Sequence, residues 1–172
     1  MKTLNFIFIL LIGQFFMDCN HKTHSDPPEV KTEYGIEREE VEEVSPPPPG
    51  LTTKFKTLEE WLLNICDKEK PEKSITTYNF GLFESSDDYT IFLVGINKYA
   101  QGQDSVTRID FEPSSMYYPL PKSEYKNLTR EQVQDQLTSL LKNFIKTDTF
   151  KNSFLAKAYS ITVDFYGTIW SR

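Results

Sequence analysis

The stretch YTIFLVGI, residues 89–96, constrains the fold more than any other part of the chain. It is apolar at odd and even positions and rich in β-branched residues, so it predicts a strand whose two faces are both covered. The preceding segment TYNFGLFE, residues 77–84, largely alternates apolar and polar side chains. Because only the short polar turn at 85–88 separates them, we expect an antiparallel hairpin at the centre of a sheet.

The rest of the domain follows from similar patterns. We predict two further strands, at 106–112 after a loop at 97–105, and at 160–170. A helix is expected at 57–68 and a longer one within 127–146, followed by a short helical segment. The order α-β-β-β-α-α-β indicates an α+β domain, residues 51–172, with an antiparallel sheet of about four strands and helices on one face.

Both helices carry start signals and an apolar stripe. Thr57 with Glu60, and Thr129 with Gln132, have the spacing of a capping box. The apolar positions recur at helical spacing, which predicts the side chains that face the core. These are Leu58, Trp61, Leu62, Ile65 and Cys66 in the first helix and Val133, Leu137, Leu140, Leu141 and Phe144 in the second.

The amino-terminal residues have the order of a secretory signal peptide. Lys2 is followed by an apolar run over 4–17 and then by a polar segment. A membrane-spanning helix needs about 20 apolar residues. The run is shorter than that, so it favours a signal peptide over a spanning helix.

The end of this run, Phe16-Met17-Asp18-Cys19, resembles the cleavage site of bacterial lipoprotein signal peptides. In that class of protein, a peptidase cuts before a cysteine whose thiol carries a diacylglycerol. The class usually has small residues where Met17 and Asp18 stand. The resemblance implies removal of residues 1–18, a lipid on Cys19, and export to the bacterial cell envelope with the membrane as one partner. The alternative role for Cys19 is a disulfide with Cys66.

Residues 19–50 predict a tether. The segment from residue 20 has three basic and eight acidic residues and few large apolar ones, so it favours disorder. Its run Pro46–Pro49 predicts a stiff polyproline II spacer next to the domain. Without the tether, the chain's charge of −6 falls to about −1, which lacks the basic excess of a nucleic-acid-binding domain. We therefore expect neither DNA nor RNA as the principal partner.

Few residues of the domain suggest catalysis. Residues 51–172 contain no histidine, which excludes Ser–His and Cys–His nucleophiles and the commonest zinc ligand. They also lack the phosphate-loop and calcium-loop motifs, so we predict no metal and no cofactor. The remaining catalytic candidates are Asp110, Glu112 and Asp164, which could act as an acid–base pair in an envelope hydrolase if their strands were neighbours.

The loop EPSSMYYPLPKSEY, residues 112–125, favours a different function. Tyrosines offer a large contact area and prolines pre-order a loop, a combination suited to recognition. The candidate partner-binding residues are Met116, Tyr117, Tyr118, Leu120 and Tyr125. The alternative is that they cover part of the sheet. The leading hypothesis is a non-enzymatic envelope lipoprotein that binds a protein or an envelope component, for example an immunity-type protein.

Overall fold

The computed structural model describes residues 39–85, 88–101, 104–164 and 167–172. The signal-peptide region and Cys19 lie outside these residues. Within the described ranges, no helix has the length and apolar character needed to cross a membrane. The residues from 39 onward form an α+β domain, as predicted.

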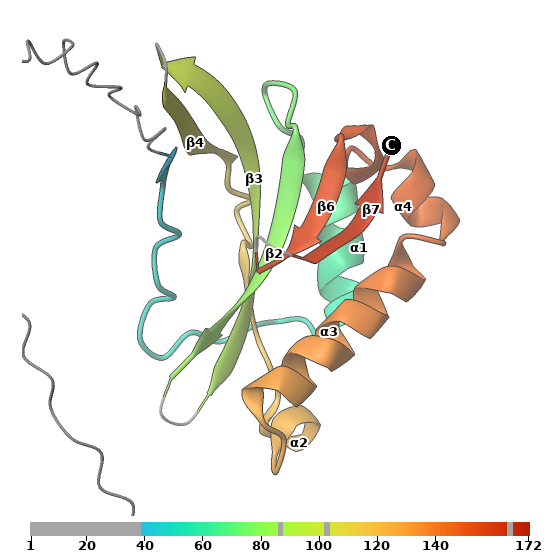
Figure 1. The fold of residues 1–172 in the computed structure, drawn as a ribbon. Coiled ribbons are helices and arrows are strands. Elements are labelled where there is room, and N and C mark those ends of the chain that lie inside the picture. Colours follow the sequence, from blue (N-terminus) through green and yellow to red (C-terminus); the bar gives the residue numbers. More distant parts are fainter. Residues whose placement is uncertain (1–38, 86–87, 102–103, 165–166) are drawn as a thin grey trace, which may run out of the picture. The chain divides into compact units, whose positions relative to one another are not determined.

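The domain is built on a seven-stranded sheet (Figure 1). Its order is β1-β4-β3-β2-β6-β7, and β5 pairs with part of β3. The predicted hairpin is confirmed, and its two strands, β2 and β3, lie inside the sheet. The strands are β1 Glu39–Val41, β2 Thr77–Glu84, β3 Tyr89–Gln101, β4 Asp104–Phe111, β5 Tyr117–Pro119, β6 Ser160–Val163 and β7 Gly167–Ser171.

The sheet is mixed, so the predicted antiparallel sheet of four strands is wrong. β6 runs parallel to β2, because the chain crosses back through the helices before it re-enters the sheet. β1 runs parallel to β4 at the opposite edge. All the other pairs are antiparallel.

Two regions contain more strand than the sequence indicated. Residues 97–101, predicted as a loop, extend β3 and pair with β4. Because this end of the hairpin is exposed, its residues are polar, and a polar composition does not indicate a strand. The segment 160–170 forms the hairpin β6–β7, with Asp164 at a φ of 48° directly after β6.

A bulge at Asp110 changes which side chains share a face. Gly95 pairs with Phe111 while the next residue, Ile96, pairs with Ile109. Asp110 is therefore the extra residue of β4. Phe111 packs into the helix-side core and Ile109 against the cluster on the opposite face, whereas plain alternation predicted one face for both.

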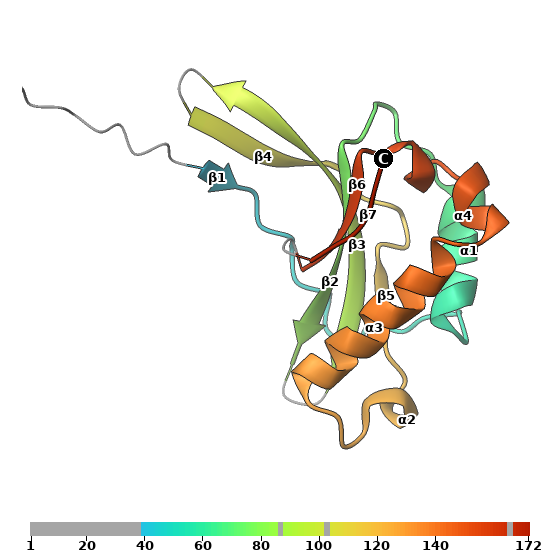
Figure 2. The same cartoon turned by 45° about the vertical axis from the view of Figure 1, so that its right-hand side comes forward.

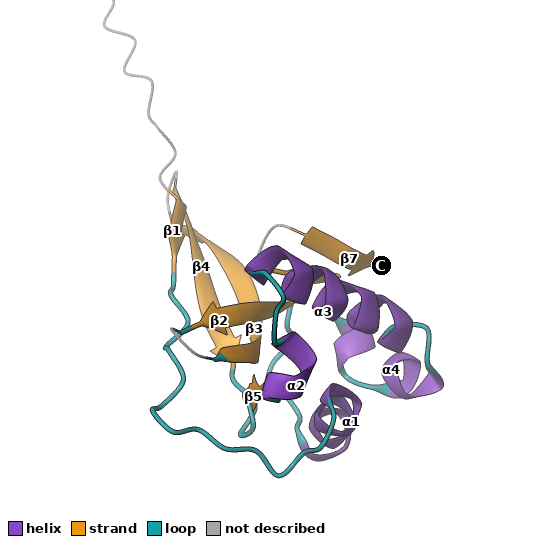
Figure 3. Ribbon diagram, turned by 90° about the horizontal axis from the view of Figure 1, so that it is seen from below, coloured by secondary structure: helices purple, strands orange, loops and turns teal. Residues whose placement is uncertain are grey.

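The helices cover one face of the sheet (Figure 3). They are α1 Leu58–Lys68, α2 Lys122–Tyr125, α3 Arg130–Phe144 and α4 Asp148–Asn152, followed by a 3₁₀ turn at Leu155–Lys157. The capping box at Thr129 and Gln132 is complete. At α1 only half of it forms, because the Glu60 carboxylate accepts from the Lys56 N–H instead.

Most of the predicted stripe residues are buried between the helices and the sheet. The exceptions are Cys66, which is half-buried, and Leu140, whose predicted burial is wrong because it is 53% exposed. Burial raises the pKa of the Cys66 thiol, although a hydrogen bond with Ser153 opposes the shift.

The described end of the predicted tether belongs to the domain, so its boundary at residue 50 is too late. β1 lies alongside β4, and the chain then descends past the sheet (Figure 2). The Glu42 N–H donates to the Thr107 carbonyl at 3.0 Å, and Val44 packs against the smaller apolar cluster. A disorder prediction from charge does not detect this attachment. The free backbone groups at a sheet edge can pair with another segment almost independently of its side chains.

Candidate functional site

A groove of about 460 Å³ lies at the turn end of the β2–β3 hairpin. One wall comes from the hairpin, a second from the end of β5, and a third from residues 46–51, which we call the proline segment. The volume falls within the usual range for ligand pockets. The lining residues outside the proline segment are Phe83, Glu84, Ser85, Asp88, Thr90, Pro119 and Leu120.

The proline segment is tied to the domain at its start and folds into a turn at its end. At its start, the Tyr117 hydroxyl donates to the Ser45 carbonyl at 2.6 Å. At its end, the Leu51 N–H donates to the Pro48 carbonyl at 3.3 Å, with Gly50 at a φ of 70°. A proline followed by a left-handed glycine is the sequence of a type II turn, so these residues position the groove wall locally.

The predicted recognition loop supplies part of this groove in an unexpected way. Leu120 lines it directly. Tyr117 holds the proline segment, and the Tyr125 hydroxyl donates to Asp88 Oδ1 at 2.8 Å. Thus two of the tyrosines position the walls through their hydroxyl groups.

Met116, Tyr118 and Tyr125 are buried, so their side chains do not form an exposed binding surface, and for Met116 and Tyr118 the alternative that the loop covers part of the sheet holds. The reason is β5, which pairs with β3 and places alternate residues on opposite faces of the sheet. Tyr118 stacks on Trp61 with ring centroids 5.8 Å apart, while Met116 joins Phe92 and Val94 on the other face.

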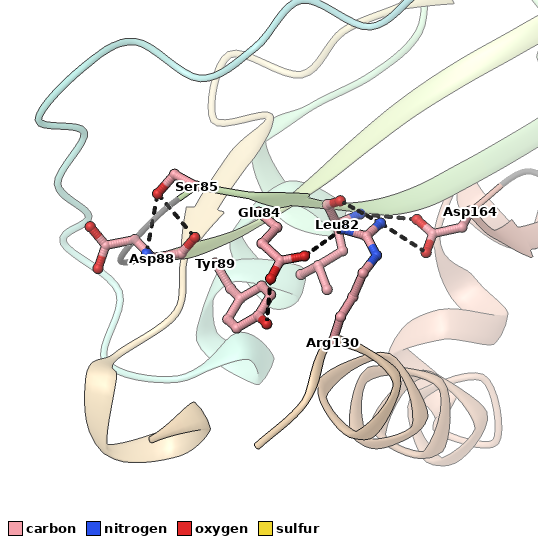
Figure 4. Close-up of polar contacts among 7 residues, drawn as sticks. All are labelled: Leu82, Glu84, Ser85, Asp88, Tyr89, Arg130 and Asp164. Atoms are coloured by element: carbon pink, nitrogen blue, oxygen red, sulfur yellow. Dashed lines mark hydrogen bonds and ion pairs between the residues drawn. The ribbon is translucent and has the colours of Figure 1, made fainter. Parts of the chain in front are cut away.

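Beside the groove, a polar cluster closes the edge of β2 beyond the end of β6 (Figure 4). The Leu82 N–H donates to Asp164 Oδ1 at 3.0 Å, and Arg130 donates to the Leu82 carbonyl at 3.2 Å. Arg130 also lies 3.5 Å from a Glu84 oxygen, and the other oxygen accepts from the Tyr89 hydroxyl at 3.0 Å. The Asp164 and Arg130 side chains form the hydrogen bonds with the Leu82 backbone that a neighbouring strand would otherwise form.

Burial raises the pKa of Asp164, although the Leu82 N–H and the charge of Arg130 both oppose the shift. The carboxylate lies 4.0 Å from an Arg130 nitrogen. Its contacts are therefore those of a structural group that holds the end of β6 against β2.

Asp110 lies in a separate place, so the predicted approach of Asp110 to Asp164 is wrong. β3 and β2 stand between their strands, a separation of about 14 Å at the usual spacing. Asp110 accepts from Lys73 at 2.5 Å, from Asn97 at 2.8 Å and from Tyr99. Burial by itself would raise its pKa, but these donors outweigh it and the pKa is lowered. The third candidate, Glu112, is exposed.

In the part of the chain that the structure describes, the side chains do not assemble a set of metal ligands. No group of three or more His, Cys, Asp or Glu side chains is placed to hold an ion there. The arrangement is suited to binding through the groove, because its lining mixes apolar side chains with carboxylates and hydroxyls.

The sequence reasoning missed Phe83, Glu84, Ser85, Asp88 and Thr90 as groove residues. They had been interpreted only as strand ends and a turn. A signal was present in the nearby proline run, whose stiffness would allow it to stand away from the sheet as a wall. The pairing that brings the run beside the hairpin is long-range, so no local pattern indicated it.

No family model matches this chain, and neither the curated proteins nor the solved structures include a match to it.

Proposed function

We propose that this chain is a bacterial envelope lipoprotein, anchored through Cys19, whose domain is a non-enzymatic binding module for a protein partner. The anchor is supported by the short apolar run and the cysteine that ends it. The binding role is supported by the groove at the turn end of the β2–β3 hairpin.

The groove carries the proposal because two of its walls are held by specific contacts. Tyr117 secures the proline segment and Tyr125 secures Asp88, so both walls are pre-ordered before a ligand arrives. Pre-ordering lowers the entropy that binding must overcome. Immunity of the cell to a secreted toxin remains one concrete version of such binding.

Cys19→Ala is expected to move the protein from the membrane fraction to the soluble fraction, because the residue that would carry the lipid is lost. A single acyl chain gives only marginal membrane binding, and two give stable anchoring. Fractionation followed by immunoblotting measures the change, with Cys66→Ala as the matched control that should stay in the membrane. Retention of the Cys19 variant would contradict lipid anchoring.

Leu120→Lys is expected to reduce recovery of the partner by about tenfold or more, since a charge would enter an apolar wall of the groove. The measurement is quantitative mass spectrometry of proteins cross-linked to the full-length chain in its host. Tyr117→Phe should give a smaller loss, because only the hydroxyl that holds Ser45 is removed.

The control for both variants is Tyr159→Ala, which alters a side chain that is 66% exposed and does not line the groove. Circular dichroism should show the same folded signal for all three variants. If Leu120→Lys and Tyr159→Ala recover the same partners in the same amounts, the groove is not the binding site.

A further inference from the structure

The groove presents hydrogen-bond acceptors and negative charge. Glu84 and Asp88 contribute carboxylates, while Ser85 and Thr90 contribute hydroxyls. The prolines of the proline segment have no N–H with which to donate to a ligand. Among the described residues, those that line the groove include no lysine, arginine or histidine. A complementary ligand therefore brings donors and positive charge.

The two carboxylates are not equivalent. Glu84 already faces Arg130 at 3.5 Å and accepts from Tyr89. Asp88 accepts from the Tyr125 hydroxyl, which is neutral, and the ion pairs among the described residues do not include it. Figure 4 shows its carboxylate pointing away from Arg130. Asp88 is therefore the group whose charge a ligand would balance.

The apolar part of the lining adds a second requirement. Phe83 and Pro119 both pair with Thr90 across the sheet, so they share a face, and both line the same groove as Asp88. A long aliphatic stem can lie along such side chains while its charged end reaches a carboxylate. An arginine side chain meets both conditions, and its fork of donors can bond several acceptors at once.

We propose that the groove binds an arginine side chain of the protein partner, with the stem against Phe83 and Pro119 and the guanidinium at Asp88. This inference rests on the proposed function and names the chemistry of the partner. It predicts that the partner presents a basic, extended or loop segment at this interface.

The test uses the full-length protein in detergent micelles and follows amide chemical shifts during titration with N-acetyl-arginine amide. Saturable shifts at Thr90 and Leu120 are expected. The isosteric but uncharged N-acetyl-citrulline amide should bind about tenfold more weakly or not at all, because the charge-assisted bond is lost. Equal binding of the two probes would overturn the proposal.

Asp88→Asn is expected to weaken binding of the arginine probe by about tenfold. The amide oxygen can still accept from Tyr125, so the groove wall is retained. Glu59→Gln, an exposed charge on α1, is the matched control and should leave the titration unchanged. Unaltered affinity of the Asp88 variant would overturn the assignment.

The two proposals fail separately. If Leu120→Lys abolishes partner recovery but the arginine probe does not bind, the groove is a binding site for a different chemistry. If the probe binds through Asp88 but Leu120→Lys recovers every partner, the groove selects guanidinium groups and the protein partner binds elsewhere.

Discussion

Gly81→Ala is expected to lower the free energy of unfolding by about 2–3 kcal/mol, although it adds only one methyl group. Gly81 pairs with Phe92 across the β2–β3 hairpin. A Cβ at residue 81 would overlap the ring of Phe92, which covers the glycine. Phe92 is itself 5% exposed, so its ring has little room to move. Urea unfolding monitored by circular dichroism measures the loss.

Gly167→Ala is the matched control. A Cβ there would meet only the Val163 carbonyl oxygen, at 3.5 Å, an ordinary contact. The expected change is about 0.5 kcal/mol or less. A double-mutant cycle with Phe92→Leu should recover at least about 1 kcal/mol, because the smaller side chain makes space for the new methyl group. Additive effects of the two substitutions would contradict the steric explanation.

The same contact supports the groove. Phe92 packs against Phe83 with ring centroids 5.0 Å apart, and Phe83 lines the groove. Gly81 therefore leaves the space that the Phe92 ring occupies against β2. We expect Gly81→Ala to disturb the groove wall as well as the stability of the sheet.

Local patterns were sufficient for the elements that interact with their neighbours in sequence. The β2–β3 hairpin follows from two strands and a short turn, and the capping box at Thr129 follows from spacing alone. The parallel pairing of β6 with β2 depends on residues about 80 positions apart, as in Tyr78 with Ile161. No short segment of the sequence indicates a pairing between strands so far apart in the chain.

The candidate site was predictable to a similar extent. Leu120 was identified and does line the groove, because an apolar residue between prolines is held near the surface. Tyr118 was misassigned because composition cannot tell which face of a short strand is covered. Asp110 and Asp164 were expected to meet on the assumption that their strands are adjacent, and the crossover places β6 beyond β2 instead.

Trp61→Ala is expected to cost about 3–5 kcal/mol of folding stability, the largest effect of any change considered. The side chain is fully buried, stacks on Tyr118 and meets the edge of Phe80 with centroids 6.3 Å apart. Its indole N–H also donates to the Ser115 carbonyl at 2.6 Å. The substitution therefore removes both a large apolar volume and a bond that holds the loop before β5.

Two further variants separate these contributions. Trp61→Phe keeps most of the packing and is expected to lose about 1–2 kcal/mol, mainly from the unpaired Ser115 carbonyl. Trp170→Ala, on the edge strand β7, should cost clearly less than Trp61→Ala because that ring is only half-buried. Equal losses for the two tryptophans would contradict the placement of Trp61 at the centre of the core. If the placement holds, Trp61→Ala should also loosen the residues around Tyr117, and partner recovery should fall even at temperatures where the domain stays folded.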